Sequence, residues 1–146
     1  MASIHWGSNW GYNISSEQQE FAHKLIDTAG IDLIHGHSSH HAKGIEVCRD
    51  KLILYGCGDF LNDYEGIGGY ENFRSDLCLM YLVSLETSTG RLLSLDITPM
   101  QIRRLRVNNA TEADILWLRE TLDREGKKLG CRVELKGHNT LSLMWK

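Results

Sequence analysis

Apolar residues recur at helical spacing in two stretches of the chain. The first stretch lies between Ser16 and Gly30, and the second begins after Thr111. Serine and threonine cap the first turn of a helix and glycine ends the last, so we predict an amphipathic helix over residues 16–29 and another behind Thr111. The apolar positions are Phe21, Ala22, Leu25, Ile26 and Ala29 in the first stretch and Ile115, Leu118, Leu122 and Leu129 in the second.

Short apolar runs on both sides of the first helix predict strands. "MASI" leads straight into His5, and "IDLIH" follows the helix at residues 31–35. A strand, helix and strand in this order form a right-handed crossover between parallel strands, which brings the carboxyl ends of both strands to one edge of the sheet. We therefore expect His5 and the loop over residues 37–41 at that edge, where open α/β sheets bind their ligands.

The remaining apolar runs predict antiparallel strands. "IEVC" and "KLILYGC" flank Arg49 and Asp50 as a hairpin, while "DLCLMYLVSLE", "RLLSLDI" and "MQIRRLRV" predict a meander. "CRVEL" and "LSLMW" predict a last hairpin around Gly137. One βαβ unit followed by a meander, a helix and a hairpin predicts a mixed α/β (α+β) fold, with residues 1–146 forming a single domain. Because an apolar run enters His5 without a preceding turn, we expect further sheet partners upstream.

Composition excludes several classes of protein. A hydrophobic content of 42%, a charged content of 24% and a single proline are typical of a soluble globular chain. The net charge of −3 gives no basic field for nucleic acid, and we interpret the basic run over residues 102–106 as a solvated strand face. No apolar run approaches the roughly 20 residues of a membrane span, and no signal peptide is predicted.

The four cysteines show no CxxC spacing. Three of them, Cys57, Cys78 and Cys131, lie inside apolar runs, and Cys48 ends another. We interpret all four as buried free thiols without disulfides, in a reducing and therefore cytoplasmic compartment.

The run "HGHSSHH" at residues 35–41 is the strongest candidate for chemistry. His37 and His40 lie three residues apart on one loop, and with His5 on the neighbouring strand end they could supply three nitrogen ligands to a metal. The alternative is that His40 and His41 are solvated loop residues and His5 packs against a tryptophan. Two further histidines, His23 on the polar side of the first helix and His138 in the last hairpin turn, are expected in solvent.

An acidic and glycine-rich loop follows the strand "LILYGC". Asp59 comes directly after a glycine at the strand end and is a candidate ligand or general base, whereas Asp63 and Glu65 are expected to be solvated. A serine hydrolase is not supported, because no G-x-S-x-G elbow exists. The run "GIGG" lacks the lysine and the preceding strand of a phosphate loop.

Three segments carry a resemblance to a known family. "IHWGSNWGYNI", "FAHKLIDTAGIDLIHGHSSHHAKGIEV" and "KLILYGCGDFLNDYEGI" are similar to the C-terminal half of the bacterial capsule synthesis family, the CapA type linked to poly-γ-glutamate production, and the similarity continues to "WLRETL". The resemblance implies a calcineurin-like metallophosphoesterase fold, an αββα sandwich. It also implies that His5 and His37 match metal-ligand positions, that His40 matches the second histidine of the family's "GHHPH", and that the cofactor is a divalent ion such as Mn, Fe or Zn.

The chain departs from the family pattern at three places. Asn9 stands where the family commonly has glutamate, Ser38 and Ser39 replace the central residues of "GHHPH", and Asp59 replaces the asparagine of "GNF". The carboxylates that the resemblance assigns to an N-terminal half are also absent. A two-metal hydrolytic site needs a bridging carboxylate and ligands for both ions, so we expect the chain to be incomplete and inactive alone.

Two functions remain open at this point. The first is a metal-dependent, metallophosphoesterase-like domain of capsule or poly-γ-glutamate biosynthesis, with His37 and Asp59 in catalytic roles and a phosphorylated or amide-linked anionic small molecule or polymer as substrate. The alternative is a non-catalytic module that binds an anionic polymer or a partner protein. In both cases we expect an exposed strand edge through which the chain self-associates.

Overall fold

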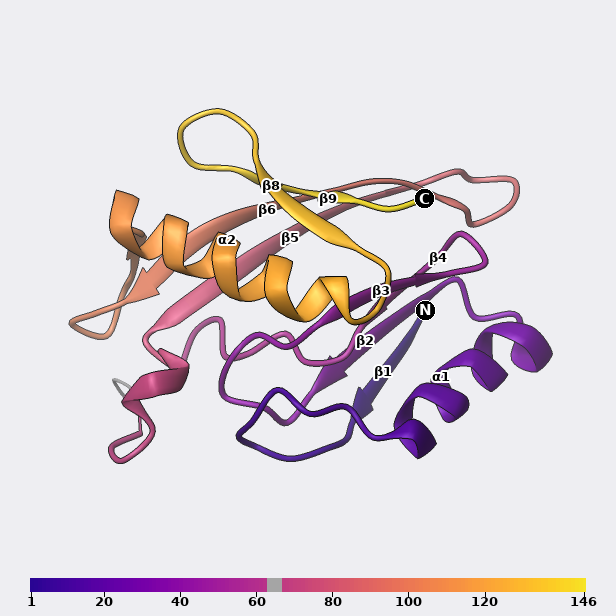
Figure 1. The fold of residues 1–146 in the computed structure, drawn as a ribbon, viewed down its shortest axis with the longest axis horizontal. Coiled ribbons are helices and arrows are strands. Elements are labelled where there is room, and N and C mark those ends of the chain that lie inside the picture. The colour runs from indigo at the N-terminus through magenta and orange to yellow at the C-terminus, as the bar shows by residue number, and fades with distance from the viewer. Residues whose placement is uncertain (63–66) are drawn as a thin grey trace.

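The computed structural model of the protein describes residues 1–62 and 67–146, which form two sheets and two α-helices (Figure 1). In chain order the elements are β1 (Ala2–His5), α1 (Ser16–Ala29), β2 (Leu33–His37), β3 (Ile45–Cys48), β4 (Lys51–Leu54), the 3₁₀ turn η1 (Glu71–Phe73), β5 (Leu77–Leu85), β6 (Leu92–Ile102), β7 (Val107–Asn109), α2 (Glu112–Lys127), β8 (Arg132–Leu135) and β9 (Leu141–Met144). Asp63 and Glu65, which we expected in solvent, lie outside the described residues.

The first sheet has the strand order β1-β2-β4-β3 and contains the predicted crossover. β1 pairs in parallel with β2, and β2 pairs in parallel with β4. β3 and β4 form the predicted hairpin, in which Arg49 and Asp50 both adopt positive φ angles, of 50° and 61°. Two consecutive residues with positive φ are what a tight turn between twisted strands requires, so this short link fixes β3 at the edge of the sheet.

Helix α1 covers one face of this sheet. The helix spans the predicted residues, but its cap is Ser15 rather than Ser16, because Ser15 Oγ accepts the hydrogen bond from the Gln18 backbone N–H. Gly30 ends the helix in a left-handed conformation with φ of 64°. The buried side chains of the helix, Ala22 and Ile26, pack with Ile34, Ile53 and Tyr55 of the sheet and its continuation.

The second sheet has the order β5-β6-β9-β8, with β7 also paired to β6. The predicted meander is wrong in one respect, because its second and third strands are a single strand, β6, that continues through Pro99. Pro99 pairs with Leu79 on β5, while on the other side of β6 it falls between the segment paired with β9 and the segment paired with β7. No strand there needs the N–H that proline lacks, so the proline is tolerated.

The basic run after β6 is a turn and not the solvated strand face that we expected. Arg103 and Arg106 exchange backbone hydrogen bonds across it, and the two residues between them, Arg104 and Leu105, both have φ of 55°. Charged side chains in a tight turn stay in water, so this segment connects β6 to β7 without contributing to the core.

Helix α2 and both sheets share one hydrophobic core. Thr111 caps α2 in a reciprocal capping box with Asp114, as its place before the apolar repeat predicted. The α2 side chains in this core are Ile115, Leu118 and Leu122, which join Leu52 and Leu54 of the first sheet and Leu95, Ile97 and Val133 of the second. Figure 1 shows β1 to β4 as one layer and the long strands β5 and β6 as another. The α/β class predicted from the order of the elements is confirmed.

All four cysteines are free thiols, as predicted. Cys57, Cys78 and Cys131 are buried, but Cys48 is only half-buried, because it lies at the edge strand β3. The cytoplasmic compartment stays a prediction. In the part of the chain that the structure describes, neither helix has the length and apolar character needed to cross a membrane.

Candidate metal centre

His5 and His37 lie side by side at the carboxyl ends of β1 and β2. They are direct partners in the register of the parallel pair, and their ring centroids are 5.3 Å apart with the rings edge to face. Residues paired across two strands project from the same face of the sheet, so the crossover predicted from the sequence is what brings these two imidazoles together. The prediction that they share one edge of the sheet is confirmed.

A third histidine, His35, extends this row and was not among our candidates. Its ring centroid lies 5.7 Å from that of His37, and Ser3 Oγ is 2.9 Å from His35 Nδ1. Burial, with a further contribution from His37, lowers the pKa of His35. Residues two apart in a strand share a face, so the spacing of His35 and His37 alone carried the signal that would have found it.

Two loops meet at the end of this row. The Trp6 backbone N–H donates to the His37 carbonyl at 3.0 Å, and the His40 N–H donates to the Asn9 carbonyl at 3.1 Å. Ser38, directly after His37, has φ of 121°, a conformation that a side chain rarely adopts and that persists only where the surroundings enforce it. These hydrogen bonds hold the loop after β1 against the loop after β2.

Gly36 allows the indole of Trp6 to cross the strands beneath the histidine row. The Trp6 Nε1–H donates to the Tyr55 carbonyl at 3.0 Å. A Cβ atom at Gly36 would lie 2.6 Å from the Leu54 carbonyl oxygen and 2.7 Å from that of Tyr55. Real Cβ atoms do not approach backbone oxygens so closely, so a side chain at this position would displace the indole and the strand behind His37.

His40 lies on the loop after β2 and is held by Asp59. His40 Nδ1 lies 3.0 Å from Asp59 Oδ2, and Asp59 Oδ2 also accepts a hydrogen bond from Asn62. The two side chains of the pair are each 22% exposed. A carboxylate on Nδ1 fixes the orientation of the ring and presents Nε2 as the nitrogen that could bind a metal. On the sequence alone, Asp59 is a candidate ligand or general base. In the structure its carboxylate is placed to orient His40.

His41 is a core residue, which corrects the alternative in which it was a solvated loop residue. It is 2% exposed, lies against Tyr12 and Phe73, and has Nδ1 3.0 Å from the Ala42 carbonyl oxygen. Trp10 also packs against it, with ring centroids 6.0 Å apart and the ring planes 14° from parallel. Burial lowers the pKa of His41 to about 4, because the charged imidazolium would lose its hydration there. The imidazole is therefore neutral at pH 7.

His23 also departs from expectation, whereas His138 does not. We expected His23 in solvent, but its Nε2 lies 2.7 Å from Glu46 Oε1 because α1 lies across the face of β3 that carries Glu46. His138 is exposed in the turn between β8 and β9, as predicted.

The histidines at this edge fit part of a metal centre and not all of it. Within residues 1–62 and 67–146, the ligand atoms of His5, His37 and His40 are not all within 4.8 Å of one another. His5 and His37 nevertheless offer adjacent nitrogen ligands, and the carboxylate on His40 is the usual partner of a metal-binding imidazole. The chain thus supplies nitrogen ligands suited to Zn, Mn or Fe, and a complete site needs further ligands.

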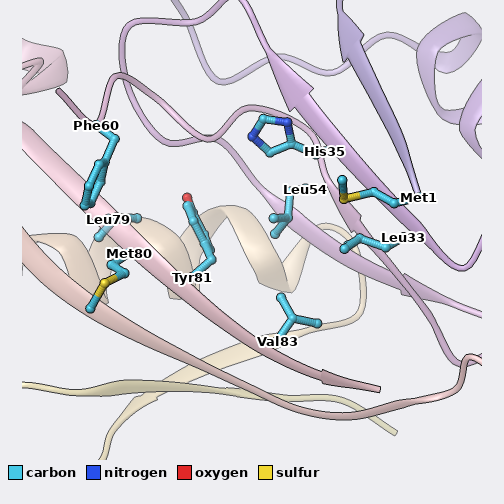
Figure 2. A pocket seen from close by; sticks show the side chains of 9 residues that line it. All are labelled: Met1, Leu33, His35, Leu54, Phe60, Leu79, Met80, Tyr81 and Val83. Atoms are coloured by element: carbon cyan, nitrogen blue, oxygen red, sulfur yellow. The ribbon is translucent and has the colours of Figure 1, made fainter. Parts of the chain in front are cut away.

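An apolar groove opens beside the histidine row. Its volume is about 400 Å³, and it lies between the face of the first sheet that carries His35 and the strand β5 (Figure 2). The residues that line it are Met1, Leu33, His35, Leu54, Phe60, Leu79, Met80, Tyr81 and Val83. The groove extends from Met1, directly before the edge strand β1, to the edge strand β5, and each of these strands has one strand partner among the described residues.

Comparison with known proteins connects the chain to capsule synthesis. The family described as "Bacterial capsule synthesis protein PGA_cap" matches residues 1–64, the segment that contains His5, His37, His40 and Asp59. The chain is 49% identical over 144 residues to a "probable polyglutamine synthesis accessory protein" of Mycobacterium tuberculosis, an alignment that covers 99% of this chain and 38% of that protein. It is 32% identical over 63 residues to the "capsule biosynthesis protein CapA" of Bacillus anthracis, which covers 43% of this chain and 15% of that protein.

These matches cover the crossover, the histidine row and the loops that hold His40. The chain spans 38% of the length of the mycobacterial relative that it matches over nearly all of its own residues. The resemblance drawn from "HWG", "GHSSH" and "GCGDF" is confirmed: residues 1–64 match the bacterial capsule synthesis family, and the chain is similar to proteins of the CapA type.

Proposed function

We propose that this chain supplies the histidine part of a divalent-metal, hydrolase-like site in a protein of capsule or poly-γ-glutamate biosynthesis. The observation that carries the proposal is the direct pairing of His5 with His37 at a strand end, with His40 oriented by Asp59 on the adjoining loop. A bound ion would polarise a phosphoryl or carbonyl oxygen and activate water at this edge.

In this proposal the chain's own residues supply nitrogen ligands for the ion and a carboxylate that positions one of the histidines. His5 and His37 bind the ion through ring nitrogens, and Asp59 fixes the orientation of the His40 ring through Nδ1. The substrate class is an anionic molecule, phosphorylated or amide-linked, because a divalent ion beside imidazoles favours negative charge. A metal-independent role in binding an anionic polymer or partner is the competing function, and the word "accessory" in the name of the mycobacterial relative is what favours it.

Replacing Asp59 tests the orientation of His40. In Asp59→Ala, we expect the affinity of the chain for Mn²⁺, measured by isothermal titration calorimetry, to fall about 10- to 100-fold, the usual cost of removing the carboxylate behind a ligand histidine. Asp59→Asn should lose less, because the amide oxygen still accepts a hydrogen bond from Nδ1. The matched control is Glu120→Ala, which removes an exposed carboxylate of α2. Equal affinities in the wild type and Asp59→Ala would contradict the assignment.

We further propose that the groove between the first sheet and β5 receives polypeptide from the part of the family-length protein that this chain does not span. The strands β1 and β5 both end their sheets, and two side chains of β5 are exposed: Met80, which lines the groove, at 38%, and Leu82 at 52%. Exposed strand edges next to apolar surface favour pairing with another chain.

Adding that missing part should therefore stabilise the chain. Alone, the chain should be marginally stable or self-associate in light scattering. With the remaining part of a family relative expressed separately and present at ~100 times its Kd, we expect about 2.7 kcal/mol more unfolding free energy in denaturant titrations. A monomer of ordinary stability that gains nothing from the added part would show that the groove has no such occupant.

A further inference from the structure

A second group of metal-ligating side chains lies on the opposite face of the first sheet from the histidine row. His23 of α1 and Glu46 and Cys48 of β3 place a ring nitrogen, a carboxylate oxygen and a sulfur within 4.8 Å of one another. All three side chains are partly buried. Among the described residues, no other group of three or more histidine, cysteine, aspartate or glutamate side chains has its ligand atoms this close together.

The fold itself brings these three residues together. Glu46 and Cys48 are two apart in β3, so they project from the same face, and α1 lies across that face with His23 toward them. Cys48 belongs to the same small core as Ala22 and Ile26 of the helix. The group therefore bridges a helix and the edge strand of the sheet.

A buried tyrosine orients the carboxylate of the group. The Tyr55 hydroxyl donates to Glu46 Oε2 at 2.6 Å, while Glu46 Oε1 lies 2.7 Å from His23 Nε2. Burial, together with the neighbouring carboxylate, raises the pKa of Tyr55, so its hydroxyl remains a donor. A hydrogen bond to one carboxylate oxygen leaves the other directed at His23, which is how outer residues commonly prepare a carboxylate ligand.

The charges around Cys48 favour a cation. Burial raises the pKa of the Cys48 thiol, and the carboxylates of Glu46 and Asp27 raise it further. Arg49 offsets part of this negative field through an ion pair with Asp27 at 2.8 Å. A thiol held protonated beside two carboxylates becomes a thiolate when a divalent ion supplies the missing positive charge, and the proton is released to solvent.

We propose that His23 Nε2, Glu46 Oε1 and Cys48 Sγ bind Zn²⁺, with water in the fourth position. Nitrogen, oxygen and sulfur ligands in a tetrahedral arrangement suit this borderline-soft ion. Two ligands at zinc-bond lengths of about 2.0–2.1 Å lie ~3.3 Å apart in a tetrahedron. His23 and Glu46 thus need to separate by only about half an ångström, by exchanging their hydrogen bond for the ion. The bound ion ties α1 to β3, and the site does not depend on the histidine row.

Cobalt substitution tests this site on the folded chain. We expect Co²⁺ to give the thiolate-to-cobalt charge-transfer absorption and tetrahedral visible bands, and Zn²⁺ to displace it and raise the melting temperature. Cys48→Ser should lose the charge-transfer band, and His23→Gln should bind Zn²⁺ at least tenfold more weakly. Cys78→Ala and His138→Gln should behave as the wild type, and His37→Ala, which alters the histidine row, should still keep the thiolate-to-cobalt band.

A measurement on the unaltered chain guards against variants that fail to fold. Zn²⁺ at saturating concentration should slow the alkylation of Cys48 at least tenfold, as followed by peptide mass spectrometry. An alkylation rate that Zn²⁺ leaves unchanged, or a charge-transfer band that survives in folded Cys48→Ser, would overturn the proposal. The proposal would also be overturned if His37→Ala lost zinc binding while His23→Gln kept it, because the zinc would then be bound by the histidine row.

Discussion

Lowering the pH from 7 to 4 is expected to remove about 3 kcal/mol of unfolding free energy through one side chain, His41. Burial lowers its pKa to about 4, with repulsion from Lys43 and His40 acting in the same direction and hydrogen bonds to backbone carbonyls opposing it. In the unfolded chain the pKa returns to about 6.5. Above that pH both states are neutral and the stability is complete. Between pH 6.5 and 4 the unfolded state binds a proton at His41 and the folded state does not. The free energy of unfolding therefore falls across this pH range.

The measurement is urea unfolding at several pH values between 7.5 and 4, with a chelator present so that no metal contributes. In His41→Asn, whose amide can still donate to the Ala42 carbonyl, the loss of unfolding free energy over this range should be about 3 kcal/mol smaller than in the wild type. His138→Asn removes an exposed histidine and should leave the pH profile unchanged. Parallel pH profiles for the wild type and His41→Asn would show that the buried ring is not what resists protonation.

Replacing His37 with alanine should have the largest effect on metal binding at the edge of the sheet. His37 is the central member of the row, with His5 on one side and His35 on the other. Removing a side chain that binds the ion directly lowers metal affinity more than removing a carboxylate that holds a ligand histidine. We therefore expect the affinity for Mn²⁺ to fall on the order of 100-fold or more. Manganese is the probe because it prefers nitrogen and oxygen ligands over the sulfur of Cys48.

The control for this change is His138→Ala, which removes a histidine far from the row and should bind Mn²⁺ as the wild type does. His5→Ala should resemble His37→Ala, since the two rings are direct neighbours. If His37→Ala binds Mn²⁺ normally while both proteins bind an anionic polymer such as poly-γ-glutamate without metal, the competing function as a binding module is favoured instead.

Local signals were enough to predict the arrangement of His5 and His37. The cap before α1, the left-handed Gly30 and the two short apolar runs define a crossover whose handedness and direction follow from general rules. The same reasoning would have found His35, because alternation along a strand is also a local property.

Contacts between distant segments could not be predicted in the same way. The burial of His41 depends on rings from Trp10, in the loop after β1, and Phe73, in the 3₁₀ turn η1. The pairing of His23 with Glu46 depends on the order of strands in the first sheet, which places the face of β3 under α1. A sequence pattern shows that a position is polar, but it does not show which remote side chain will cover it.

The most direct test of the metal site is an anomalous-scattering experiment on crystals of the protein grown with Mn²⁺. Our account predicts an anomalous peak about 2.0–2.3 Å from ring nitrogens of both His5 and His37, with His40 turned toward it by Asp59. The same map separates this site from the one at His23, Glu46 and Cys48, which lies on the other face of the sheet. A map from metal-saturated protein without a peak beside His5 and His37 would contradict the assignment of this histidine row as a metal centre.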